Sequence, residues 1–134
     1  MLAAAARIGA PLGHDFCVIN LSDNLKPWAV IEKRLRLAAE ADFAMAFYNP
    51  RSKSRPEGFA SALEILKTSC GDDRPVIFAR AVSTKQETVT VLPLSRADAD
   101  MADMRTIVLV GSSQTRLVEH QNKKWVYTPR SLQD

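Results

Sequence analysis

Hydrophobic and polar residues along the chain follow strand-like and helix-like periods in turn. Three short apolar runs are typical of buried strands, and they lie at residues 15–21, 43–48 and 75–80. Between these runs, residues 27–40 and 56–70 repeat apolar side chains every three or four positions, which predicts two amphipathic helices. Pro27 suits the first turn of the first helix. This order of elements predicts two right-handed crossovers around a parallel core.

The second half of the chain has shorter connections. Residues 87–92 alternate threonine with valine, as a half-exposed strand does, and residues 106–110 form a buried strand. Residues 116–127 predict a terminal hairpin that turns at Gln121-Asn122. Short connections require antiparallel neighbours. We therefore expect one α/β domain over residues 1–134, with a mixed, largely parallel sheet and flanking helices.

Composition narrows the class of protein. The chain has 134 residues, of which 46% are hydrophobic and 25% charged, and its net charge is +3. These values are typical of a globular protein and exclude a disordered chain. No apolar stretch approaches the about 18 residues of a spanning helix, so we expect no membrane association. Two cysteines without a CxxC pair, and two histidines, favour neither a disulfide framework nor a metal site, and we expect a cytoplasmic protein.

Candidate ligand-binding residues lie directly after the ends of the predicted strands. The carboxyl ends of parallel strands meet at one edge, where ligands collect in open α/β sheets. Three segments end there: Asn20–Asn24, Tyr48–Pro50 and Arg80–Ser83. The Tyr48 ring and the Asn49 amide can stack on a base or hydrogen-bond to its edge. The alternative is that Asn49-Pro50 only terminates the strand, as turn residues often do.

Arg51, Lys53 and Arg55 alternate with serines directly after Tyr48–Pro50. These side chains either hold a polyanionic ligand, since arginine pairs with carboxylates, or keep a solvated loop soluble. The scattered basic residues elsewhere do not form the basic stripe of a nucleic-acid module, so we expect no nucleic-acid partner.

Several strings resemble the tetrapyrrole methylase family, in particular its corrin branch, and the resemblance spans nearly the whole chain. They are Ala3–Phe16, Leu21–Asp23, Ala46–Ser52, Asp103–Thr106, Val110–Thr115 and Tyr127–Arg130. The family has two α/β domains with S-adenosyl-L-methionine bound in the cleft between them. The resemblance covers the second, C-terminal domain and the helix that leads into it. The N-terminal domain with the other donor motifs is expected upstream, which agrees with an alanine-rich first helix that has no capping residue before it.

The resemblance also implies roles for individual residues. Tyr48 and Asn49 correspond to a position that packs on the donor's adenosine. Ala81, with Arg80 and Val82, corresponds to the small residue whose backbone meets the adenine, and Thr106 begins the strand that closes this pocket. The loop after Ala81 lacks the family's usual glycine, and the resemblance names no catalytic base among these residues.

The resemblance implies a methyltransferase that modifies an anionic tetrapyrrole, with Arg51, Lys53 and Arg55 facing the substrate's carboxylates, and a homodimer. The resemblance also implies that methylation of this substrate, a corrin precursor, is accompanied by ring contraction. Two alternatives stay open. One is a non-catalytic ligand-binding or dimerisation domain, and the other is a family sibling that methylates RNA or protein.

Overall fold

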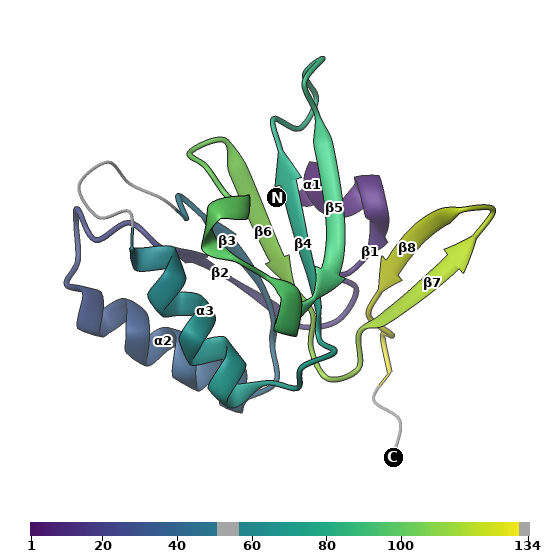
Figure 1. Cartoon of the computed structure of the whole chain (residues 1–134). Helices are drawn as coiled ribbons and strands as arrows, with labels where there is room; N and C mark the ends of the chain where they lie inside the picture. The colour runs from purple at the N-terminus through teal and green to yellow at the C-terminus, as the bar shows by residue number, and fades with distance from the viewer. Residues whose placement is uncertain (51–56, 132–134) are drawn as a thin grey trace.

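The computed structural model describes residues 1–50 and 57–131 and contains two sheets (Figure 1). The larger sheet has the strand order β2-β3-β6-β4-β5. Its strands are β2 (Phe16–Asn20), β3 (Ala44–Tyr48), β4 (Pro75–Arg80), β5 (Thr88–Pro93) and β6 (Thr106–Val110). One face is covered by α2 (Trp28–Glu40) and α3 (Gly58–Ser69), and the other by the short α1 (Leu2–Ile8). The prediction of a mixed α/β sheet with flanking helices is confirmed.

The pairing within this sheet corrects the expectation of a largely parallel arrangement. Strands β2, β3 and β4 run in one direction, as the two crossovers require, but only β2 and β3 are parallel neighbours. Strand β6 lies between β3 and β4 and is antiparallel to both. The chain reaches β6 from β5 through two 3-10 turns, η1 (Leu94–Arg96) and η2 (Ala99–Met101). This crossover brings β6 into the sheet in the direction of β5, opposite to its neighbours.

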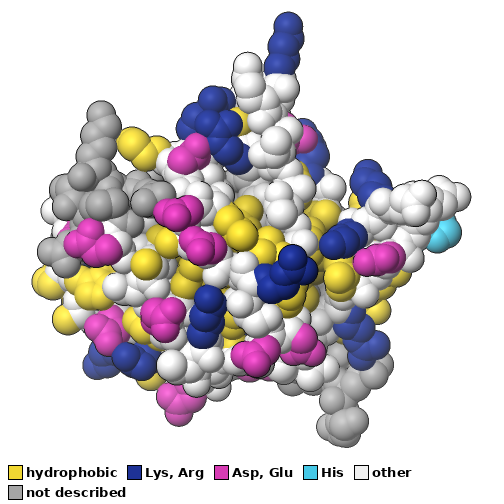
Figure 2. Space-filling model, in the orientation of Figure 1, with side chains coloured by type: hydrophobic (Ala, Val, Ile, Leu, Met, Phe, Trp, Pro, Cys, Tyr) yellow, Lys and Arg dark blue, Asp and Glu magenta, His cyan; other side chains and the backbone are white. Residues whose placement is uncertain are grey.

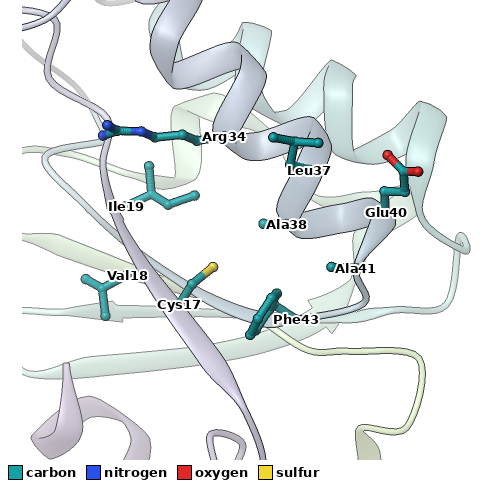
Figure 3. Close-up of a pocket in the computed structure, with 9 residues that line it drawn as sticks. All are labelled: Cys17, Val18, Ile19, Arg34, Leu37, Ala38, Glu40, Ala41 and Phe43. Atoms are coloured by element: carbon teal, nitrogen blue, oxygen red, sulfur yellow. The ribbon is translucent and has the colours of Figure 1, made fainter.

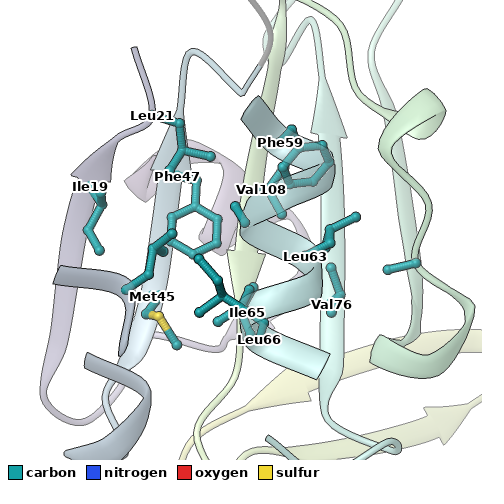
Figure 4. Close-up of a cluster of buried hydrophobic side chains, with 14 of the residues drawn as sticks. Ile19, Leu21, Met45, Phe47, Phe59, Leu63, Ile65, Leu66, Val76 and Val108 are labelled. Carbon is teal, nitrogen blue, oxygen red and sulfur yellow. The ribbon is translucent and has the colours of Figure 1, made fainter. Parts of the chain in front are cut away.

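The main core lies between the larger sheet and the pair α2 and α3. Leu35 of α2, Phe59 of α3 and Phe47 of β3 are fully buried in one cluster. Figure 4 shows Phe47 and Phe59 within it. The Phe59 and Phe78 rings meet edge to face, with centroids 6.1 Å apart. The spacing of apolar residues in the sequence therefore identifies the buried faces of both helices correctly.

The opposite face of the sheet has a thinner covering. Ala4, Ala5 and Ile8 of α1 pack on Ala46 and Ala79 in its centre. Small side chains on both sides let the helix backbone approach the sheet closely. Helix α1 has no side-chain cap at its N-terminus, as the sequence indicates.

A second, three-stranded sheet stands beside the first. It joins β1 (Gly9–Ala10) to the predicted hairpin of β7 (Arg116–His120) and β8 (Lys123–Tyr127). Gly9 has φ 133°, and a Cβ there would lie 2.5 Å from the Val126 carbonyl oxygen. Glycine is thus required for the parallel pairing of β1 with β8.

On the face shown in Figure 2, Lys and Arg side chains are interspersed with Asp and Glu. Among the described residues, no helix has both the length and the apolar character needed to cross a membrane.

Candidate functional site

One edge of the larger sheet brings the predicted site segments together. Strands β2, β3 and β4 end at this edge and β6 begins there, at the top of the sheet in Figure 1. Arg80 lies opposite Thr106 across β4 and β6, while Phe47 lies opposite Val108 across β3 and β6. Tyr48 and Asn49 therefore end β3 on one side of the Thr106 position, and Ala81 follows β4 on the other side.

The end of β3 is fixed to the end of β2 by hydrogen bonds. The Asn49 side-chain amide donates to Oδ1 of Asn20 over 3.1 Å, and the same oxygen accepts from the Ser22 backbone N–H at 2.9 Å. The Leu21 N–H donates to the Tyr48 carbonyl oxygen at 3.1 Å. Asn49 itself has φ 52°, a left-handed conformation that asparagine tolerates better than most residues.

A hollow of about 620 Å³ opens beside these residues. Its lining includes Asn20, Asn24, Lys26, Tyr48 and Asn49. The Tyr48 residue is 41% exposed, so part of its surface is available to a ligand. Lys26 Nζ donates to the Asn20 carbonyl oxygen at 2.9 Å, which holds a positive charge at the rim. An aromatic ring, amides and a cation at one strand end suit a polar ligand with a flat ring system.

The loop after β4 has a strained backbone. Ala81 has φ 53° and Ser83 has φ 68°, which are left-handed conformations in residues that carry a Cβ. The resemblance implies a glycine in this loop, and in its place alanine and serine adopt left-handed conformations that glycine favours. Hydrogen bonds hold Ala81 in place: its N–H donates to the Arg105 carbonyl oxygen at 3.1 Å, and its own carbonyl oxygen accepts from Thr84 Oγ1 at 2.7 Å. Such strain persists where surrounding contacts over-determine it, often at ligand sites.

Arg80 and Thr106 both contact Asp103. Arg80 Nε donates to Asp103 Oδ2 over 2.5 Å, and Thr106 Oγ1 donates to Oδ1 at 3.0 Å. The hydrogen bond from Arg80 holds the pKa of Asp103 below its ordinary value, helped by the Arg105 N–H and Thr106. Thr106 is 2% exposed. These side chains therefore brace the start of β6 against the end of β4.

Asp103 has no role in the sequence-based interpretation. The sequence feature that could have indicated its role is the spacing of three residues to Thr106. An acidic residue three positions from a hydroxyl often forms a local hydrogen-bonded turn.

A second contact absent from the sequence interpretation ties α1 to the loop after β4. Arg7 Nε lies 3.1 Å from Glu87 Oε1, and Arg7 Nη2 donates to Ser83 Oγ at 3.3 Å. The Ser83 N–H donates to the same Glu87 oxygen at 2.8 Å, which is the main cause of a lowered Glu87 pKa, with Arg7 contributing further. The loop geometry thus depends on a residue about 80 positions upstream.

The predicted substrate residues Arg51, Lys53 and Arg55 lie outside the described residues. The two thiols, Cys17 and Cys70, are free and half-buried, and burial raises the pKa of each. Both pack against the main core, as small hydrophobic residues do.

An α/β domain with this strand edge matches a known class of enzymes. Residues 1–98 match the family model of tetrapyrrole (corrin/porphyrin) methylases, and the chain belongs to this family. Its relatives include a precorrin-3B C(17)-methyltransferase of a Sinorhizobium species, 58% identical over 97% of this chain and 52% of the relative. A probable cobalt-factor III C(17)-methyltransferase of Salmonella typhimurium is 45% identical over 85% of this chain and 47% of the relative.

Solved structures show the same fold. The crystal structure of the methyltransferase CobJ superimposes with a TM-score of 0.90 at 61% identity, over 96% of this chain and 52% of that chain. A uroporphyrin-III C-methyltransferase from Thermus thermophilus, complexed with S-adenosyl homocysteine, has a TM-score of 0.54 at 16% identity, over 83% of this chain and 49% of that chain. This chain spans about half the length of each of these four proteins.

Proposed function

We propose that this chain supplies one wall of the donor site of an S-adenosyl-L-methionine-dependent methyltransferase that acts on a corrin precursor. The observation that carries the proposal is the left-handed backbone of Asn49 and of Ala81, at 52° and 53°, where two strands end at the same sheet edge. Both segments are held there by hydrogen bonds, so the polar edge is formed before any ligand arrives. Preformed sites bind with a smaller ordering cost.

The described residues fit the adenosine part of this donor. The exposed part of Tyr48 can stack on the adenine ring. Asn49 Nδ2 donates a hydrogen bond to Asn20. The Asn49 side-chain oxygen can then accept a hydrogen bond from a ribose hydroxyl or from the exocyclic amine of adenine. The backbone of Ala81 and Val82 can approach the adenine edge because Ala81 has a small side chain. Bound there, the donor supplies an electrophilic methyl group on a sulfonium.

The proposed acceptor is precorrin-3B, a polycarboxylate. The relative with this name is 58% identical to the chain, against 45% for the one named for cobalt-factor III. Arg51, Lys53 and Arg55 follow Asn49-Pro50 in the sequence and would pair with the carboxylates. Methyl transfer is an in-line displacement, so this half of the enzyme contributes mainly by positioning donor and acceptor.

A chimera tests the proposal. The half of the Sinorhizobium relative that this chain lacks is fused to residues 1–134, and transfer of a labelled methyl group to precorrin-3B is measured. We expect the chimera to methylate precorrin-3B more efficiently than its cobalt-containing counterpart, and residues 1–134 alone to show no turnover. A folded chimera that binds donor but transfers no methyl group to either acceptor would overturn the proposal. The intact relative is the positive control.

A further inference from the structure

The turn that follows β4 has the backbone pattern of a type II β-turn. The Thr84 N–H donates to the Ala81 carbonyl oxygen at 3.1 Å and closes the turn. Its two central residues are Val82 and Ser83, and of these only Ser83 has a positive φ, of 68°. A positive φ at the third position of the turn defines type II and favours glycine there. Contacts from outside the turn must therefore stabilise serine in this position.

Glu87 holds the central peptide of this turn in one orientation. Its Oε1 accepts a hydrogen bond from the Ser83 N–H at 2.8 Å. The Val82 carbonyl belongs to the same trans peptide, so it points the opposite way, away from the carboxylate. Rotation of this peptide would convert the turn to type I, with a negative φ at Ser83, but it would aim the Val82 carbonyl oxygen at the Glu87 carboxylate. The negative charge of Glu87 therefore selects the type II orientation.

Helix α1 contacts both central residues of the turn. Arg7 Nε lies 3.1 Å from Glu87 Oε1, and Arg7 Nη2 donates to Ser83 Oγ at 3.3 Å. The Val82 side chain packs against the cluster of buried residues to which Ile8 of the same helix belongs. The helix thus fixes Val82 by apolar packing, and it fixes Ser83 and the carboxylate that orients the peptide by hydrogen bonds from Arg7.

We propose that Arg7 and Glu87 are positioning residues that hold the Val82–Ser83 peptide in one orientation and thereby set the affinity of the site for the methyl donor. The proposal rests on the function proposed above, in which the backbone of Ala81 and Val82 approaches the adenine edge. A flip of the peptide replaces a carbonyl oxygen by an N–H on the side away from Glu87, so a ligand that hydrogen-bonds to one orientation is rejected by the other. The apparent affinity then falls with the fraction of chains whose turn has the binding orientation.

Replacing Glu87 tests the orientation of the peptide directly. The carbon chemical shifts of Ser83, measured by NMR on the 134-residue chain, report the sign of its φ. We expect a positive φ in wild type and a mainly negative φ in Glu87→Ala, because the acceptor of the Ser83 N–H is lost. Glu40→Ala is the matched control. This exposed glutamate ends α2, on the face of the sheet opposite α1, and lines a groove of about 780 Å³ between β2 and α2 (Figure 3).

The consequence for the donor is measured in the chimera described above. We expect Glu87→Ala to weaken the binding of S-adenosylhomocysteine by roughly tenfold, because about one chain in ten would keep the binding orientation. The KM for the donor should rise by a similar factor, while kcat at saturating donor stays within about twofold of wild type. Arg7→Gln should weaken binding by roughly threefold and Arg7→Lys by less, since an exposed ion pair contributes modestly. Glu40→Ala should leave donor binding unchanged.

Glycine at position 83 provides a rescue that is specific to this mechanism. Glycine adopts a positive φ without help from Glu87, so Ser83→Gly combined with Glu87→Ala should bring the donor affinity back to within about threefold of wild type. Glycine could not replace a carboxylate that touched the donor itself.

The positioning role is overturned if Ser83 keeps its positive φ in Glu87→Ala. It is equally overturned if this variant of the chimera binds S-adenosylhomocysteine as tightly as wild type, or if Ser83→Gly fails to rescue it. Failure of the wild-type chimera to bind S-adenosylhomocysteine would instead overturn the proposed function, and the NMR measurement would still decide whether Glu87 orients the turn.

Discussion

Asn49 Nδ2 donates a hydrogen bond to Asn20 Oδ1 across 3.1 Å, joining the ends of β2 and β3 through residues 29 positions apart. Asn20 Oδ1 also caps the Ser22 N–H, so one carbonyl oxygen organises both segments. The bond orients Asn49 with its own side-chain oxygen left to accept from a ligand.

Replacing Asn49 tests this relationship. Asn49→Asp removes the donor and sets a carboxylate oxygen against Asn20 Oδ1, and we expect the free energy of unfolding to fall by about 1–2 kcal/mol. Asn49→Gly loses the same bond but accepts the left-handed backbone, so its loss should be about 1 kcal/mol or less. Urea unfolding measures both, with Asn24→Asp as the control. Equal stability of Asn49→Asp and wild type would show that the bond has no structural role.

Ala81 tests the strained loop. A β-branched residue is less compatible with φ 53° than alanine, so Ala81→Val should destabilise the chain by about 2 kcal/mol. Ala81→Gly relieves the backbone strain in the folded chain, but it also increases the conformational entropy of the unfolded chain. Because these two effects are of similar size and opposite sign, the stability should stay within about 1 kcal/mol of wild type. Thermal unfolding separates the two variants. If valine were tolerated as well as glycine, the left-handed conformation would not be what the site requires.

Asp103 gives a pH dependence of defined sign. Its pKa in the folded chain is held below the ordinary value of 3.8, chiefly by Arg80. The contribution to stability is therefore present above that ordinary value and is lost as the pH falls through the folded-state pKa. We expect the free energy of unfolding to drop less between pH 7 and acidic pH in Asp103→Asn than in wild type. Since the Asp103 side chain is 45% exposed, added salt should shrink the difference.

Arg51, Lys53 and Arg55 test the acceptor side of the proposal. Their replacement by glutamine in the chimera should raise the KM for precorrin-3B and flatten its dependence on salt, because fewer charges attract the carboxylates. The kcat should change less than the KM. Unchanged kinetics at low and high salt would show that these residues do not bind the acceptor and only keep the loop soluble.

Local patterns predict much of this fold. Pro27 and the apolar spacing after it place α2 within a residue of its observed start at Trp28, and Gln121-Asn122 marks the turn of the hairpin. Such features depend on neighbours in the sequence. Pairing partners depend on distant residues: the insertion of β6 between β3 and β4, and the contact of Gly9 with Val126, have no local signal.

The same distinction holds for the candidate site. The sequence predicts that strands end at Tyr48-Asn49 and at Arg80-Ala81, and the structure places both ends at one edge of the larger sheet. The side-chain partners are not readable. Arg80 donates a hydrogen bond to Asp103, and Arg7 of α1 contacts the loop after β4. Tertiary packing brings these groups together, and their spacing in the sequence does not indicate it.

Asn49 and Ala81 are proposed to belong to one wall of a donor site, and one titration tests this most directly. S-adenosylhomocysteine is titrated into the isotope-labelled 134-residue chain while its backbone amide resonances are followed by NMR. With one wall present, we expect weak, millimolar-range binding, because each 1.4 kcal/mol of lost contact costs about tenfold in affinity. The shifting resonances should be those of Asn20, Tyr48, Asn49, Ala81 and Val82, while those of the hairpin β7–β8 stay fixed. Shifts confined to other parts of the chain, or none at the highest ligand concentration, would show that Asn49 and Ala81 do not line a donor site.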